Sequence, residues 1–215
     1  MSAATRTHDA VQRAIDICVA AAILAACFPV MLVVAALIAV GLGRPVLFRQ
    51  PRPGLHGRAF VLVKFRTMLD VDEKRGLITD ADRLNALGRI LRATSLDELP
   101  TMWNVLRGDM SLVGPRPLLM RYLERYTPEQ ARRHLVRPGV TGLAQVHGRN
   151  ALSWEEKFAL DIWYVENRSL ALNARICAET LRTALRREGI AAAGDVTMPE
   201  FTGSARVGKQ RTGNV

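Results

Sequence analysis

Two adjacent carboxylates, Asp97 and Glu98, are the residues whose types and spacing best suit catalysis. Ser95 and Glu98 have the spacing of a capping box, while Pro100 favours a later helix start with Asp97 as the N-cap. Either register places Asp97 at a helix N-terminus, where the helix dipole favours the ionised carboxylate. An ionised carboxylate beside a second acid suits a nucleophile next to a metal ligand, although both acids could instead only cap the helix.

A second candidate stretch, Gly114-Pro115-Arg116-Pro117, follows on the C-terminal side of these acids. The two prolines fix their own φ angles and push the residues before them toward extended geometry. The Arg116 guanidinium is therefore presented from a stiff segment, which suits a bidentate grip on phosphate oxygens. The plainer alternative is a rigid turn that carries an exposed arginine.

Both stretches lie within residues 94–118, whose sequence TSLDELPTMWNVLRGDMSLVGPRPL resembles the signature of the bacterial sugar transferases known as monotopic phosphoglycosyl transferases. The resemblance covers most of residues 10–175, in family order. It continues in three further segments: KFRTM at 64–68, RPGVTGLAQVHGRN at 137–150 and WEEKFALDIWYV at 154–165.

The resemblance implies transfer of a sugar-1-phosphate from a nucleotide diphosphosugar, by family expectation a UDP-sugar, to polyprenyl (undecaprenyl) phosphate, with release of UMP. We expect Asp97 to attack the sugar-bearing phosphate and form a covalent sugar-phosphoryl-aspartate. Because a diphosphate is inert until its charge is neutralised, we also expect Mg²⁺, held mainly by Glu98 with Asp97 as a second ligand. By the same resemblance, the substrate-binding residues are Lys64, Arg66, Arg92, Arg116, Gln145, Arg149 and Asp161.

Three positions depart from the family pattern. Thr101 stands where Gln commonly follows the DELP string, which predicts altered sugar recognition. Asn173 stands where Asp is common, so a charge at that position is not required. Phe28 stands where family members often place Ser, whose hydroxyl can satisfy a backbone carbonyl freed by the following Pro29.

Residues 17–43 form an uncharged run that is too long for a secretory signal. As a helix, the run would measure about 40 Å, against a hydrocarbon core of roughly 30 Å. Pro29 near its middle predicts a kink. The resemblance implies a re-entrant helix with both ends in the cytoplasm, while a kinked single span is the alternative. Residues 44–68 carry six basic residues and no acid, which predicts that this side faces the cytoplasm.

The pattern beyond the membrane run predicts a mainly helical α+β fold. We expect a membrane helix at 10–43, a cytoplasmic catalytic domain with a β-hairpin at 44–202, and a basic disordered tail at 203–215. The hairpin strands are predicted at 46–50 and 59–68. Helices are predicted at 82–92, 101–106, 122–135 and 154–167, with a last helix that begins at Leu170.

The formal net charge of +10 predicts acidic partners. Besides the diphosphosugar, polyprenyl phosphate and membrane lipid, this charge also suits a non-catalytic, membrane-tethered protein that binds lipid or nucleic acid. Aromatic residues make up only 6% and do not alternate with the basic residues, which disfavours nucleic acid. The three cysteines form no CxxC pair, as in a reducing compartment. We therefore expect an enzyme at the bacterial inner membrane, with its catalytic domain on the cytoplasmic face.

Overall fold

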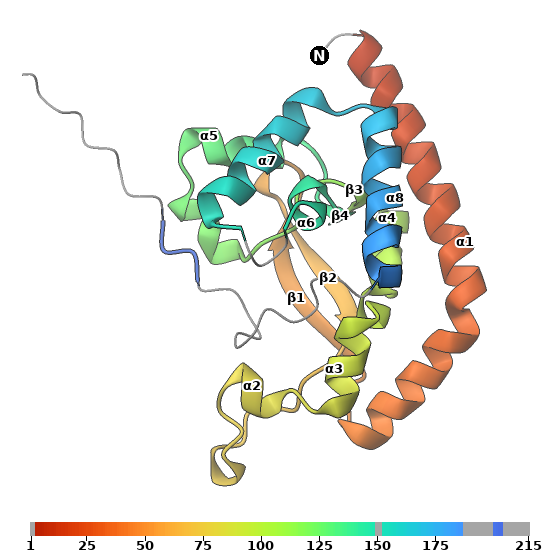
Figure 1. The fold of residues 1–215 in the computed structure, drawn as a ribbon, viewed down its shortest axis with the longest axis vertical. Helices are drawn as coiled ribbons and strands as arrows, with labels where there is room; N and C mark the ends of the chain where they lie inside the picture. Colours follow the sequence, from red (N-terminus) through yellow and green to blue (C-terminus); the bar gives the residue numbers. More distant parts are fainter. Residues whose placement is uncertain (1–2, 149–151, 187–199, 204–215) are drawn as a thin grey trace, which may run out of the picture.

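The computed structural model of the protein describes residues 3–148, 152–186 and 200–203. One long helix, α1 (Ala3–Gly41), runs along one side of a body of short helices and two small sheets. Figure 1 shows α1 starting near the top of α8 (Leu170–Arg186) and bending back toward the body at its other end. The tail predicted at 203–215 lies, apart from Gly203, outside the described residues.

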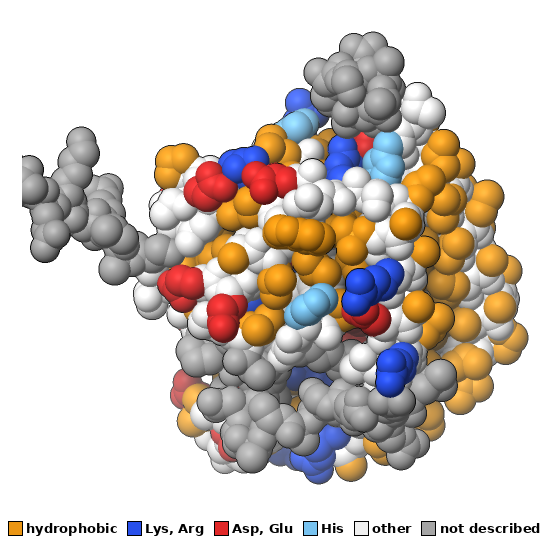
Figure 2. All heavy atoms as spheres, turned by 45° about the horizontal axis from the view of Figure 1, so that its top comes forward, with side chains coloured by type: hydrophobic (Ala, Val, Ile, Leu, Met, Phe, Trp, Pro, Cys, Tyr) orange, Lys and Arg blue, Asp and Glu red, His pale blue; other side chains and the backbone are white. Residues whose placement is uncertain are grey.

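The outer face of α1 is apolar and exposed. Phe28, Leu32 and Val33 leave 57 to 60% of their surface uncovered, and Figure 2 shows hydrophobic side chains crowded over this side of the molecule. Among the described residues, the segment Thr7–Gly41 is the one helix long and apolar enough to cross a membrane. The helix continues through Pro29, and Phe28 before it points outward without disrupting it.

The first half of α1 docks on the body through polar side chains. The Arg13 guanidinium donates to the carbonyl of Leu106 at 2.7 Å, and the buried Asp16 carboxylate accepts from the Leu112 amide at 3.0 Å. Gln12 links the helix to Asn173 on α8 at 2.8 Å. These contacts tie the N-terminal end of the helix to the globular body.

The second half of α1 packs on the same body through apolar side chains. Val34, Ile38 and Leu42 form a buried cluster with Phe65 and Leu91. Both ends of the helix therefore contact one globular unit, as α1 in Figure 1 also shows.

The predicted hairpin is present, with longer first and shorter second strands than expected. Strand β1 (Leu47–Pro53) pairs antiparallel with β2 (Ala59–Phe65) across the short 3₁₀ turn η1 (Leu55–Gly57). Pro51 and Pro53 lie inside β1, which is tolerated because a two-stranded sheet has only edge strands. The sequence pattern ended the strand before these prolines.

A second, parallel pair of strands is a feature that the sequence pattern did not predict. Strand β3 (Ser111–Val113) pairs with β4 (Gly139–Thr141). The approach is close: a Cβ on Gly139 would lie 2.1 Å from the backbone nitrogen of Gly114, so only glycine fits there. This pairing anchors the start of the Gly-Pro-Arg-Pro segment.

Two predicted helices are broken in the structure. Residues 82–92 divide into α2 (Asp80–Arg83) and α3 (Ala86–Ala93), because Asn85 caps a new helix through the Gly88 amide. Residues 122–135 divide into η4 (Met120–Arg125), α5 (Pro128–Ala131) and η5 (Arg132–Leu135). A capping box at Thr127, followed by Pro128, starts the new turn there.

The two long C-terminal helices are confirmed: α7 (Trp154–Asn167), which a capping box at Ser153 starts, and α8 (Leu170–Arg186). The predicted helix at 101–106 is α4 (Thr101–Arg107), which ends one residue later than expected. The remaining elements are η2 (Glu73–Arg75), η3 (Leu96–Glu98) and α6 (Leu143–Val146).

Candidate active site

The acidic pair lies in a turn rather than at a helix cap. Asp97 and Glu98 belong to the 3₁₀ turn η3, and α4 begins only at Thr101. Ser95 adopts a left-handed conformation, with φ of 55°, and makes no capping hydrogen bond. The predicted capping box is therefore wrong, as is the alternative N-cap role of Asp97. The turn instead buries Asp97, which is 5% exposed, at the base of the site.

Burial changes the acidity of Asp97 in the direction opposite to the one expected from a helix dipole. Burial first, and then the neighbouring Glu98 carboxylate, raise the pKa of Asp97 to about 6. The cations Lys64, Arg116 and Arg92 act in the opposite direction and keep the pKa from rising further. At neutral pH the carboxylate is mostly ionised, so it remains available as a nucleophile.

Two predicted cations approach Asp97 from different elements. The Lys64 ammonium, near the end of β2, lies 3.9 Å from the Asp97 carboxylate, and burial lowers the pKa of this lysine. Arg92, near the end of α3, donates from its Nε to the Thr67 hydroxyl at 3.0 Å and interacts electrostatically with Asp97. The hairpin and α3 thus surround the acid with positive charge.

Arg116 approaches the other acid. Its Nη2 donates to the Glu98 carboxylate at 2.7 Å, while about half of its side-chain surface is exposed. The structure thus brings together five predicted residues around one turn: Asp97, Glu98, Lys64, Arg92 and Arg116. An exposed guanidinium on Glu98, near the buried Asp97, has the arrangement needed to receive an anionic substrate.

The structure does not bring two other predicted residues, Arg66 and Gln145, into this cluster. The Arg66 guanidinium binds the carbonyl of Leu42, at the end of α1, and the Asp70 carboxylate, so it secures the end of that helix. Gln145 on α6 donates to the carbonyl of Val140 at 3.3 Å. Arg149 lies outside the described residues.

Asp161 is a buried partner of an arginine rather than an open ligand. Arg133 donates from Nε and Nη2 to its carboxylate, at 3.0 and 2.7 Å, and both side chains are almost fully buried. Arg133 was missed in the sequence, as was Arg52 on β1, because nothing in the pattern distinguishes them from the other arginines. Only the packing of β1 and η5 behind the Gly-Pro-Arg-Pro segment reveals them.

Two departures from the family pattern have structural explanations. The Thr101 hydroxyl is buried and donates to the carbonyl of Val63 on β2 at 3.0 Å. Asn173 is buried between α1 and α7, where it accepts from the Tyr164 hydroxyl at 2.8 Å. An amide satisfies that position without a charge.

The acidic pair also fits a magnesium ion. Within the described part of the chain, no group of three metal-ligating side chains occurs. Mg²⁺ needs only one or two carboxylates when substrate phosphates and waters supply its other oxygens. Glu98, which is partly exposed, and Asp97 provide that donor set.

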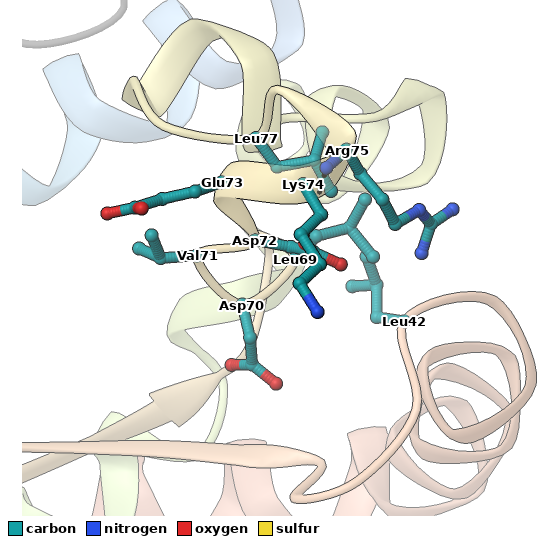
Figure 3. A pocket seen from close by; sticks show the side chains of 9 residues that line it. All are labelled: Leu42, Leu69, Asp70, Val71, Asp72, Glu73, Lys74, Arg75 and Leu77. Carbon is teal, nitrogen blue, oxygen red and sulfur yellow. Dashed lines mark hydrogen bonds between the residues drawn. The ribbon is translucent and has the colours of Figure 1, made fainter.

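A hollow in the described structure lies away from this cluster. It has a volume of about 530 Å³ and is lined by Leu42, at the end of α1, and by side chains of residues 69–75 and 77. Figure 3 shows Lys74 and Arg75 reaching into the space near Leu42, while Glu73 points away from them. None of the clustered site residues lines it, and its cations are accompanied by acids of the same segment.

Comparisons with known proteins identify the family. The family described as "Bacterial sugar transferase" matches residues 7–187. The chain belongs to the bacterial sugar transferase family. An "Uncharacterized sugar transferase EpsL" of Bacillus subtilis is 51% identical over 197 residues, which cover 91% of this chain and 98% of that protein.

Other relatives have names that state a reaction. A "UDP-glucose:undecaprenyl-phosphate glucose-1-phosphate transferase" of Caulobacter vibrioides is 43% identical, over 82% of this chain and 70% of its own length. An "Undecaprenyl-phosphate galactose phosphotransferase" of Salmonella typhimurium is 39% identical, over 68% of this chain but only 35% of its own length. The chain is thus an enzyme, a phosphoglycosyl transferase.

Proposed function

We propose that this transferase moves a sugar-1-phosphate from a UDP-sugar to undecaprenyl phosphate and releases UMP. The observation that carries the proposal is the cluster around η3: a buried, mostly ionised Asp97 beside Glu98, with Lys64, Arg92 and Arg116 near it. The names of the Caulobacter and Salmonella relatives supply the lipid acceptor and, for the first, the UDP-sugar donor.

The first step forms a bond from Asp97 to the donor. A carboxylate oxygen of Asp97 attacks the sugar-bearing phosphorus, and the bond from that phosphorus to the bridging oxygen breaks. UMP leaves with the electron pair, and a sugar-phosphoryl-aspartate remains. Arg116 and Lys64 neutralise the phosphate oxygens, so less negative charge opposes the approaching carboxylate.

The second step returns Asp97 to its free form. A phosphate oxygen of undecaprenyl phosphate attacks the same phosphorus, the acyl phosphate bond breaks, and an undecaprenyl diphosphosugar is released. Glu98, with Asp97, would hold Mg²⁺, which when bound supplies further charge neutralisation on the diphosphate. Burial of Asp97 protects the acyl phosphate from water.

We propose further that the enzyme sits on the cytoplasmic face of the inner membrane, with α1 re-entrant. The support is that both ends of α1 contact the same body, through Asp16 near one end and Leu42 at the other. A straight span would carry these ends to opposite sides of the bilayer. A re-entrant helix lets one site meet a soluble nucleotide and a lipid phosphate.

The reaction is tested by incubating the purified protein in nanodiscs with undecaprenyl phosphate, Mg²⁺ and a panel of UDP-sugars. We expect release of UMP with at least one sugar and none in EDTA. Release of UDP instead would indicate an ordinary glycosyl transferase that makes a glycosidic bond. Absence of any nucleotide product across the panel would contradict the proposal.

Topology is tested with single cysteines at Ala4 and Ser204, introduced into a cysteine-free background. An impermeant thiol reagent is applied to intact and to permeabilised cells. We expect both positions to be protected until the cells are permeabilised. Labelling at position 4 alone in intact cells would show that α1 crosses the membrane.

A further inference from the structure

The backbone of the Gly-Pro-Arg-Pro segment is held at three successive carbonyls by three different elements. The donors come from β4, η5 and β1, and each donates to a different carbonyl. The hydrogen bonds are Gly139 N–H to Pro115 O at 3.0 Å, Arg133 Nη2 to Arg116 O at 2.8 Å and Arg52 Nη1 to Pro117 O at 3.2 Å. The segment therefore has one orientation relative to the body.

This bonding supplies what the prolines alone lack. Prolines restrict φ but leave the stiff segment free to rotate as a unit, and they contribute no N–H donors of their own. A carbonyl that accepts from a fixed donor removes that rotation. The bond to the Arg116 carbonyl has the most direct effect, because it holds the residue whose side chain reaches Glu98.

Arg133 is itself held on every side. Its Nε and Nη2 donate to Asp161, and its Nη1 donates to the Tyr126 hydroxyl at 3.3 Å. The rings of Tyr126 and Phe158 lie 5.8 and 5.6 Å from the guanidinium carbon. One guanidinium thus joins an acid of α7, an aromatic cluster and the backbone of the site.

We propose that Arg133 is a positioning residue for the phosphate clamp. Oriented by Asp161, it fixes the Arg116 carbonyl, so that the Arg116 guanidinium is presented beside Glu98 and the nucleophile. The inference rests on the proposed function, in which Arg116 grips the diphosphate. It assigns Asp161 a role through Arg133 rather than a contact with substrate.

A contribution to fold stability does not by itself explain why a buried arginine and aspartate occupy positions 133 and 161. Buried ion pairs are often replaceable by apolar residues at little or no cost, because desolvation offsets their attraction. An apolar pair at 133 and 161 would fill the same space but would leave the Arg116 carbonyl without its donor. The hydrogen bond to the clamp is the feature that requires a guanidinium.

A double-mutant cycle between positions 133 and 116 tests the proposal. Arg133→Lys keeps the charge beside Asp161, but one ammonium cannot reach the carboxylate, the Tyr126 hydroxyl and the carbonyl together. We expect kcat/KM for the UDP-sugar, measured by UMP release, to fall about tenfold in the parent background. In the Arg116→Lys background we expect little further loss, because the clamp is already impaired.

Arg132→Lys is the matched control. This neighbouring arginine forms exposed ion pairs with Glu129 and Glu166, and its variant should retain the parent kinetics. Equal losses from Arg133→Lys in both backgrounds would overturn the proposal, since a purely structural role is additive. Unchanged kinetics in Arg133→Lys would also overturn it. If that variant does not fold, Asp161→Asn replaces it in the same cycle.

Hydrogen exchange provides a readout that does not depend on turnover. In Arg133→Lys, we expect faster exchange confined to the amides of Gly114, Arg116 and Leu118, and no such change in Arg132→Lys. Uniformly faster exchange, or no change at 114–118, would contradict the positioning role. If the parent enzyme releases no UMP, the proposed function fails, while the exchange pattern still decides whether Arg133 holds the segment.

Discussion

The two sides of the site are built differently. The acidic side is a single 3₁₀ turn, entered through the left-handed Ser95, and its reactive groups are related to their neighbours mainly by charge. The arginine side is a backbone fixed at three carbonyls, with a buried ion pair behind it. We therefore expect a change in the protonation of Asp97 to affect the acidic turn, while the backbone hydrogen bonds keep Arg116 in place.

Removing the nucleophile should have the largest effect. Asp97→Asn is expected to lower turnover more than about 10³-fold, because an amide cannot form the acyl phosphate. UMP release with undecaprenyl phosphate present measures this loss. Asp70→Asn is the matched control, because Asp70 is exposed and forms an ion pair with Arg66, which lies outside the cluster. Near-parent turnover in Asp97→Asn would indicate direct attack by the lipid phosphate.

Neutralising the second acid should affect both sides of the site. Glu98→Gln weakens a metal ligand and removes the charged partner of Arg116, so we expect a loss of about 10²-fold. A titration of UMP release against Mg²⁺ should show a higher concentration for half-maximal activity. An unchanged Mg²⁺ requirement would show that Glu98 does not hold the metal.

Changing the clamp should cost less. Arg116→Lys keeps the charge but loses the planar fork, so we expect about a tenfold loss in kcat/KM for the UDP-sugar. Arg107→Lys, which alters an exposed arginine paired with Asp109, is the control. Parent-like kinetics in Arg116→Lys would contradict the proposal that the Arg116 guanidinium grips the phosphates of the UDP-sugar.

The burial of Asp97 predicts a stability effect without substrate. A rise in its pKa from the ordinary 3.8 to about 6 corresponds to about 3 kcal/mol. The folded state binds this proton more tightly than the unfolded state, so stability falls as pH rises from about 4 to 6. In EDTA, Asp97→Asn should therefore have a higher Tm at pH 7.5 by several degrees.

The same comparison near pH 4 is the internal control, because the Asp97 carboxyl is then largely protonated in the folded state. The difference in Tm between the two proteins should shrink there. A Tm of Asp97→Asn below the parent value at pH 7.5 would contradict the burial argument.

The sequence predicted the members of the site better than their surroundings. The reactive acids, Lys64, Arg92 and Arg116 lie in recognisable local motifs, and the structure brings them together. Long periodic segments such as 154–167 were also predicted correctly, because their caps and apolar spacing agree.

The errors arise where tertiary contacts decide. The burial of Asp97, which reverses the direction of its pKa shift, depends on packing between η3 and β2 that no local pattern encodes. The parallel pairing of β3 with β4 joins segments far apart in sequence. The buried pair of Arg133 and Asp161 depends on the contact of η5 with α7. The Arg66 side chain likewise depends on a tertiary contact, because it binds the Leu42 carbonyl at the end of α1.

The central claim is the covalent intermediate on Asp97, and mass spectrometry of the peptide that contains this residue tests it most directly. The parent enzyme is incubated with its UDP-sugar and Mg²⁺ but without undecaprenyl phosphate, quenched with acid and digested for peptide mapping. We predict an added mass equal to one sugar phosphate on the peptide containing Asp97, lost when the lipid phosphate is supplied before quenching. Turnover with no added mass, or an added mass that persists in Asp97→Asn, would contradict the mechanism.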